Sequence, residues 1–124
     1  MKNRWNPSID EAMQHITKAL TLTQSFGNRQ FEGYSKIWLG RILAKLDPLR
    51  FDKAEESILD GIQILETLQV KSLFSAGYLY LGDLYIDTDQ KEEALRNLTK
   101  AESMFKEMGM DYWFERTQEV LERL

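Results

Sequence analysis

Side chains that could carry catalysis or hold a metal are few in this sequence, and the first of them is His15. It is the only histidine, and the chain contains no cysteine. An imidazole can act as a general base or a metal ligand, but both roles need neighbouring groups that share the task. Because no second histidine or cysteine can join it, we expect His15 to lie at the edge of a helix packing face.

Acidic residues are the other candidates for chemistry. Asp83, Asp87 and Asp89 surround Thr88 in the stretch DLYIDTDQKEE. A calcium loop needs a longer ordered set of oxygen ligands that ends in a bidentate glutamate, and this stretch lacks that register. Further carboxylates occur in pairs at expected helix starts, where the helix dipole favours negative charge: Glu55 with Glu56, and Glu92 with Glu93. The sequence therefore predicts a non-enzymatic protein with no catalytic residues, no metal and no cofactor.

Composition and charge narrow the class of protein. The chain has 124 residues, of which 43% are hydrophobic and 29% charged, as in one folded domain. Its net charge of −4 argues against nucleic-acid binding, which needs a clustered positive surface. No apolar run reaches the roughly 18 residues of a membrane span, and the N-terminal segment does not resemble a signal peptide. We expect a single cytoplasmic domain, residues 1–124, that binds neither nucleic acid nor membranes.

Apolar residues recur at helical spacing along nearly the whole chain. This pattern predicts an all-α fold of about six helices, near residues 8–26, 29–46, 52–68, 71–87, 90–108 and 111–124. Three pairs have the spacing of a capping box and mark helix starts: Ser8 with Glu11, Asp52 with Glu55, and Asp89 with Glu92. Gly27 and Gly109 follow apolar runs and suit the left-handed position after a helix end.

The sequence also repeats itself. The segments IDEAMQHITKAL, FDKAEESILDGI and KEEALRNLTKAE align without gaps, so that Ala12, Ala54 and Ala94 coincide, and Gly40 coincides with Gly82. Glycine costs roughly 1 kcal/mol against alanine inside a helix, so a gain in packing must offset each one. We expect helix crossings at which Gly40 faces Ala54 and Gly82 faces Ala94.

The pattern Y-x-x-L-G-x-x-Y at residues 78–85, followed by A-x-x-x-L at 94–98, resembles the tetratricopeptide repeat. A weaker copy, K-x-x-L-G-x-x-L, occupies residues 36–43. The resemblance implies a right-handed superhelix, or solenoid, of antiparallel helix pairs. Gly40 and Gly82 are 42 residues apart, which exceeds the usual period of about 34, so this would be a long variant of the repeat. Part of the excess is the stretch LDPLRF, which lengthens one turn.

The last third of the chain, from GYLYLGDLYI onwards, resembles the C-terminal repeat region of large bacterial multidomain signalling proteins, such as class III nucleotide cyclases fused to an ATPase domain. The repeat alignment matches the first predicted helix to the second helix of a two-helix unit. The first helix of that unit, which would normally pair with it, is absent. The chain would then be a fragment or C-terminal part of a longer protein, or a short independent array. A second copy could cover the open face of the first helix, which makes homodimerisation an alternative function.

In tetratricopeptide proteins the first helix of each unit lines a concave groove, so the resemblance also implies a binding site. The groove positions expected from the motif are Tyr34, Ile37, Trp38, Arg41, Lys45, Leu79, Tyr80, Asp83, Asp87, Arg116, Glu119 and Arg123. Aromatic anchors among charges of both signs suit a peptide or helix of a partner protein. Several positions of the family's carboxylate clamp are occupied by other residue types, including Ile37 and Leu79, so that specificity is not expected. The sequence thus predicts a protein–protein interaction module, for which regulation is one role left open.

Overall fold

The computed structural model describes residues 7–124, apart from the side chains of residues 7–9, 12, 23, 25 and 26. This part of the chain is helical and contains no strand: α1 (Pro7–Phe26), α2 (Arg29–Leu46), the 3₁₀ helix η1 (Pro48–Arg50), α3 (Phe51–Thr67), α4 (Lys71–Asp87), α5 (Lys91–Glu107) and α6 (Asp111–Leu121). The prediction of an all-α fold with about six helices is confirmed, and η1 lengthens the turn at LDPLRF. The expectations for Ser8 and Ala12 concern side chains outside the described part.

Three successive helices end in the same turn. The residue after each C-cap has a left-handed backbone, with φ of 61° at Gln69, 60° at Asp89 and 69° at Gly109. In each turn the next amide nitrogen lies 2.8–3.0 Å from the carbonyl oxygen five residues earlier, which is the Schellman arrangement. Since α3, α4 and α5 have 17 residues each, these turns recur every 20 residues. The left-handed positions predicted for Gly27 and Gly109 are confirmed.

The capping boxes predicted at Asp52 and Asp89 are wrong. Asp52 lies inside α3, and neither α3 nor α5 begins with a side-chain hydrogen bond to its first turn. Asp89 instead supplies the left-handed residue that ends α4, because it alone separates Thr88, the C-cap of α4, from Gln90, the N-cap of α5. A side-chain cap is formed by Asn28, whose Oδ1 accepts a hydrogen bond of 3.1 Å from the Phe31 N–H at the start of α2.

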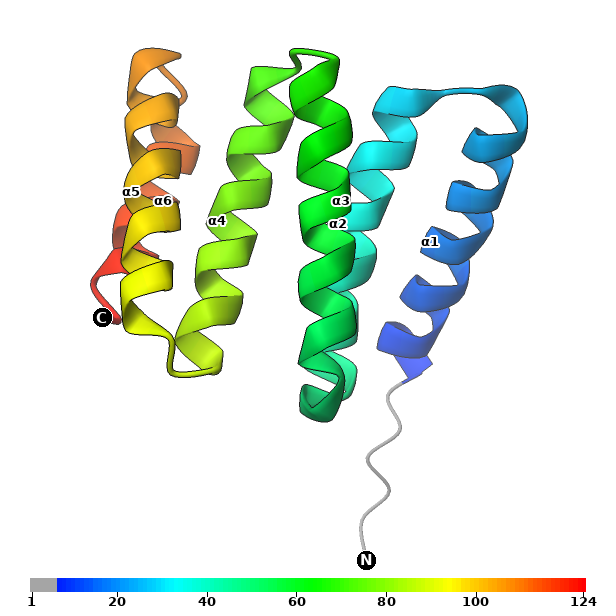
Figure 1. Ribbon diagram of the computed structural model, residues 1–124, viewed down its shortest axis with the longest axis horizontal. Helices are drawn as coiled ribbons and strands as arrows, with labels where there is room; N and C mark the ends of the chain where they lie inside the picture. The colour runs from blue at the N-terminus through cyan, green and yellow to red at the C-terminus, as the bar shows by residue number, and fades with distance from the viewer. Residues whose placement is uncertain (1–6) are drawn as a thin grey trace, which may run out of the picture.

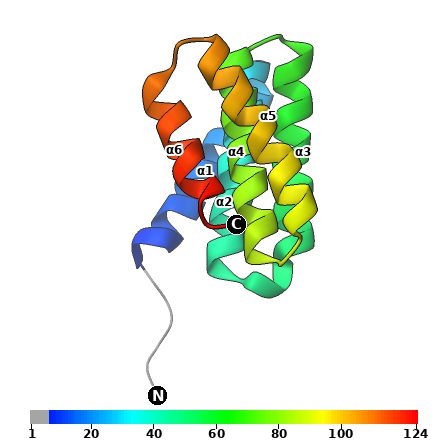
Figure 2. The ribbon, with the colours of Figure 1, turned by 90° about the vertical axis from the view of Figure 1, so that its left-hand side faces the viewer.

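The helices run up and down in chain order and form two layers (Figure 1). Each helix packs against the next, and in addition α2 contacts α4 and α4 contacts α6. Figure 2 shows α3 and α5 on one side of the molecule and α6 on the other, with α2 and α4 between them. A row of touching helices, α2–α4–α6, is therefore covered on one side by α3 and α5. Among the described helices, α1 contacts α2 alone.

Glycines lie where helices of the two layers meet. A Cβ built on Gly40 would stand 2.5 Å from the Ala54 carbonyl oxygen of α3, and one built on Gly82 would stand 2.5 Å from Cγ of Leu98 and 3.4 Å from the Ala94 carbonyl oxygen of α5. Real Cβ atoms almost never approach other atoms within 3.0 Å. The structure thus places Gly40 against Ala54, and Gly82 against Leu98 beside Ala94, so that the missing side chains let the backbones approach.

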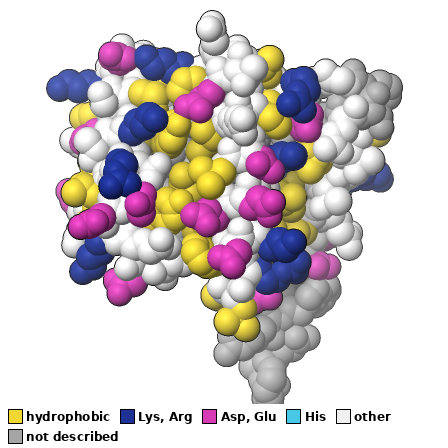
Figure 3. Space-filling model, viewed as in Figure 1, with side chains coloured by type: hydrophobic (Ala, Val, Ile, Leu, Met, Phe, Trp, Pro, Cys, Tyr) yellow, Lys and Arg dark blue, Asp and Glu magenta, His cyan; other side chains and the backbone are white. Residues whose placement is uncertain are grey.

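The face of the molecule formed by α3 and α5 carries both apolar and charged side chains. Seen from the side of α3 and α5, apolar side chains fill the strip between these two helices, and charged side chains lie over the helices on both sides (Figure 3). None of the described helices combines the length and the apolar character that a membrane crossing requires. The surface from which a ligand could approach the row α2–α4–α6 is the opposite one, away from α3 and α5.

Candidate partner-binding groove

The row α2–α4–α6 carries a cavity of about 350 Å³, to which α3 and α5 contribute no lining residue. We call this cavity the groove; its lining is Trp38, Arg41, Leu79, Tyr80, Asp83, Tyr112, Trp113, Arg116, Val120 and Arg123. A volume at the lower end of the range for ligand sites accommodates one or two side chains of a partner. The groove is therefore sized for part of a peptide rather than for a large cofactor.

Aromatic rings form a continuous row across the groove from α2 to α6. The ring centroids of Trp38 and Tyr80 are 5.6 Å apart, and those of Tyr80 and Trp113 are 6.3 Å apart. Tyr34 meets Trp38 edge-on at 6.4 Å, and Phe105 stacks on Trp113 at 5.8 Å. Such pairs contribute about 0.5–1.5 kcal/mol each beyond the area they bury. The rings hold one another in place, so this wall of the groove exists before any ligand binds.

Arg41 lies against two of these rings. Its Cζ is 4.9 Å from the ring centroid of Trp38 and 4.3 Å from that of Tyr80. Contact between a guanidinium and aromatic faces is favourable, and it restricts a side chain that would otherwise be flexible. The Arg41 side chain forms no ion pair and no hydrogen bond with any residue in the described range. Its N–H donors therefore remain free for solvent or for a ligand.

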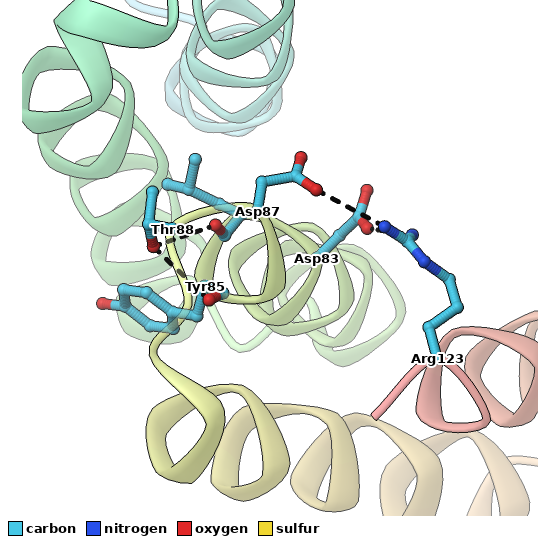
Figure 4. Close-up of polar contacts among 6 residues, drawn as sticks. Asp83, Tyr85, Asp87, Thr88 and Arg123 are labelled. Carbon is cyan, nitrogen blue, oxygen red and sulfur yellow. Dashed lines mark hydrogen bonds and ion pairs between the residues drawn. The ribbon is translucent and has the colours of Figure 1, made fainter.

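The other charged side chains of the groove are arranged differently. Nη1 of Arg123 is 2.7 Å from Oδ1 of Asp83, and Nη2 is 3.4 Å from Oδ1 of Asp87, so this guanidinium joins the segment after α6 to α4 (Figure 4). Arg116 has a carboxylate oxygen of Glu119 at 3.9 Å, one turn along α6. The charge of Asp83 is thus matched by Arg123, whereas Arg116, like Arg41, retains most of its hydrogen-bonding capacity.

Tyr80 sits at the centre of the groove with only 8% of its surface exposed. Burial raises the pKa of its hydroxyl, and the positive charges of Arg41 and Arg116 oppose that rise. The hydroxyl therefore stays neutral at physiological pH, where it can both donate and accept a hydrogen bond. Because it is so deeply set, Tyr80 forms the floor of the groove rather than a projecting anchor.

Most of the side chains that the sequence assigns to a groove come together. Trp38, Arg41, Tyr80, Asp83 and Arg116 line the cavity, as do Leu79 and Arg123. Three expected residues lie beside it: Tyr34 through its contact with Trp38, Asp87 through Arg123, and Glu119 through Arg116. Lys45 is exposed in the last turn of α2 and does not line the cavity.

Ile37 is wrong as a groove residue. It is fully buried, and it fills the space beside Gly61 of α3 and Gly77 of α4, where an added Cβ would collide with its side chain. One step along a helix turns a side chain by about 100°, which separates Ile37 in the core from Trp38 in the groove.

Three lining residues of α6 were not predicted: Tyr112, Trp113 and Val120. The repeat alignment places Trp113 with Phe31 and Leu73 and so indicates a packing position. In the structure Trp113 packs and also faces the cavity: its ring stacks on Phe105, and it is one of the residues that line the groove. A tryptophan is large enough to bury one part of its ring and present another.

Other candidate side chains remain separate from the groove. His15 is exposed on α1. The Tyr85 hydroxyl donates to Oε2 of Glu55 at 2.6 Å, which ties α4 to α3. Within residues 7–124, as far as side chains are described, no group of three or more histidines, aspartates or glutamates is placed to hold a metal ion.

Comparison with protein-family models, with curated proteins and with solved structures finds no match to this chain. The interpretation of the groove therefore depends on its own geometry and chemistry.

Proposed function

We propose that this chain is a non-enzymatic protein–protein interaction module, and that it binds a segment of a partner in the groove. The observation that carries this proposal is the preformed aromatic row, Trp38–Tyr80–Trp113, in a cavity shared by three helices. Aromatic residues and arginine dominate the residues that contribute most to protein interfaces, and both kinds are concentrated here.

We further propose that the two layers are a helical-repeat superhelix of the tetratricopeptide kind. The turn that recurs every 20 residues and the row of touching helices α2–α4–α6 support this reading. In such arrays one helix of each pair lines a continuous surface, on which a partner can contact several repeats at once. The groove lies on the surface that this architecture would present.

Selection from a random-peptide display library tests the binding function. Tyr80 is a poor choice for mutation because truncating a buried aromatic residue costs about 3–5 kcal/mol of stability. The double variant Tyr112→Ala/Arg116→Glu is better, because both side chains are exposed and both line the groove. Leu95→Ala/Arg96→Glu on α5 is its matched control, with the same change of charge and the same kind of truncation at exposed positions.

We expect the selected peptides to bind the unmodified protein and the α5 control equally and to lose at least tenfold in affinity for the groove variant, or about 1.4 kcal/mol. Circular dichroism of all three proteins checks that the fold is retained. Peptides that bind the groove variant undiminished, or a selection that yields no specific binder, would refute the proposal.

Self-association is a second candidate function, and the position of α1 favours it. Among the described helices α1 contacts α2 alone, and Leu22 on it is half exposed. A second copy could cover this face. Light scattering over a concentration series should then show a dimer that Ile16→Glu converts to a monomer, whereas a monomer at all concentrations would exclude this function.

A further inference from the structure

The side chains that line the groove carry a positive sum of charge, although the protein is negative. The groove's ionisable lining consists of the side chains of Arg41, Asp83, Arg116 and Arg123, apart from the tyrosines. Three arginines thus stand against one aspartate in the lining, in a chain whose net charge is −4. Two further carboxylates, Asp87 and Glu119, lie beside the lining against Arg123 and Arg116. A local reversal of charge in a cavity attracts groups of the opposite sign and repels partners that resemble the rest of the surface.

The arginines are not equally available. Arg123 is occupied by Asp83 and Asp87, at 2.7 and 3.4 Å. Arg116 has its nearest carboxylate at 3.9 Å, and Arg41 has no ion-pair partner among the described residues. Two guanidinium groups on opposite walls of the groove, one on α2 and one on α6, therefore lack a close anionic partner.

The setting of Arg41 adds a geometric reason. Its Cζ lies over the ring faces of Trp38 and Tyr80, at 4.9 and 4.3 Å from their centroids. A guanidinium carries five N–H donors along its edges, and a ring face offers them no oxygen acceptor, so these donors stay available to a ligand. A carboxylate can accept two parallel hydrogen bonds from such an edge, and charge-assisted bonds of this kind are roughly twice as strong as neutral ones.

We propose that the partner segment is acidic: side-chain carboxylates of a peptide bind Arg41 and Arg116 from opposite walls, and an apolar side chain between them enters the groove over Tyr80. This inference rests on the proposed function and names the chemistry of its partner. A peptide fits better than a nucleic acid, because phosphate backbones need an extended positive surface and the molecule as a whole is negative.

Fluorescence anisotropy with defined probes tests the inference. The probe is a short fluorescein-labelled peptide of glutamate, glycine and phenylalanine with an acetylated N-terminus and an amidated C-terminus, so that its carboxylates are those of side chains. Two matched probes carry glutamine or lysine in place of every glutamate. We expect the glutamate probe to bind at least tenfold more tightly than the other two, and its affinity to fall as salt is raised.

Protein variants then locate the contact. Arg116→Glu should weaken the glutamate probe at least tenfold and should strengthen the lysine probe, an exchange of preference that a loss of folding cannot produce. Arg41→Lys retains the charge but loses the paired donors, and it should also weaken the glutamate probe. Arg96→Glu on α5 has the same charge change as Arg116→Glu and should leave both affinities unchanged.

The outcomes separate this inference from the proposed function. Equal binding of the glutamate and glutamine probes, or equal weakening by Arg96→Glu, would overturn the acidic-partner inference. So would full competition by free glutarate at the concentration of the peptide, because it would indicate a site for small anions. Groove-dependent library peptides without an excess of acidic residues would also overturn it and would leave the binding function intact, whereas failure of the library selection would remove the function itself.

Discussion

Replacing Gly40 with alanine tests the close approach of α2 and α3 directly. The new Cβ would lie 2.5 Å from the Ala54 carbonyl oxygen and 2.7 Å from Cγ1 of Ile58, whereas ordinary contact begins at 3.4 Å. One of the colliding atoms belongs to the backbone and cannot move by changing a rotamer. The two helices must therefore separate by nearly an ångström, which also disturbs the packing of Ile58.

The expected magnitude follows from two opposing effects. Overpacking in a well-packed core costs typically 1–3 kcal/mol, and a collision with backbone belongs near the upper end. Alanine gains about 1 kcal/mol over glycine in a helix interior. We expect Gly40→Ala to lower the free energy of unfolding by about 2 kcal/mol, which corresponds to roughly 8 °C in Tm for a chain of this size.

Gly82→Ala provides the internal comparison. Its Cβ would collide with Cγ and Cδ2 of Leu98, at 2.5 and 2.6 Å, but would meet the Ala94 carbonyl oxygen at an ordinary 3.4 Å. Leu98 is fully buried, yet a side chain can adjust where a carbonyl cannot. Because alanine brings the same gain in helix propensity here, we expect Gly82→Ala to lower the free energy of unfolding by less, about 1 kcal/mol.

Urea unfolding followed by far-ultraviolet circular dichroism measures all three proteins. If Gly40→Ala is as stable as the parent or more stable, α2 and α3 are not in close contact, because helix propensity alone would then decide the result. A larger loss for Gly82→Ala than for Gly40→Ala would contradict the distinction between backbone and side-chain collisions.

Three further predictions concern turns, pH and surface charge. Gln69→Gly should stabilise the protein by about 1 kcal/mol, seen as a higher urea midpoint, because glycine adopts the left-handed turn without the strain of a side chain. Burial and the hydrogen bond to Glu55 raise the pKa of the Tyr85 hydroxyl in the folded protein. Its contribution to stability is therefore complete below the pKa of an unfolded tyrosine, near 10, and declines at higher pH. Tyr85→Phe should flatten the fall in stability between about pH 9 and 11. Arg123→Gln should cost less than about 1 kcal/mol, and only at low salt, since the side chains of Arg123 and Asp87 are about half exposed; an equal loss in concentrated salt would show that the side chain acts by packing.

The helices could be predicted from sequence because their apolar spacing is regular and the turns are short. The helix ends were harder to predict, because in a short junction the same residue can cap the start of one helix or close the end of the helix before it. At Asp89 the spacing to Glu92 favours an N-cap, but only one residue separates the C-cap of α4 from the N-cap of α5. That residue must turn left-handed, and aspartate tolerates this conformation better than most side chains.

The groove could be predicted in outline, since the repeat places related residues at one position in alternate helical segments of the chain. Arg41, Asp83 and Arg123 are such a set, separated by 42 and 40 residues. The sequence cannot tell which arginine Asp83 will pair with, because both are one helix away. In the structure it pairs with Arg123, and this leaves Arg41 on the rings of Trp38 and Tyr80.

The surroundings of α4 support the proposal that a partner binds on the groove side of the molecule. It contacts α2, α3, α5 and α6, and it is apolar almost all round, as expected for a helix enclosed by neighbours. After Lys71 its only charged residues are Asp83 and Asp87, and both point toward Arg123 at the groove. Tyr78 reaches the opposite surface, where its hydroxyl is hydrogen-bonded to Glu66 of α3 and Lys100 of α5. The charged residues of α4 beyond Lys71 thus all lie on the groove side, beside Arg41 and Arg116, which have no close anionic partner among the described residues.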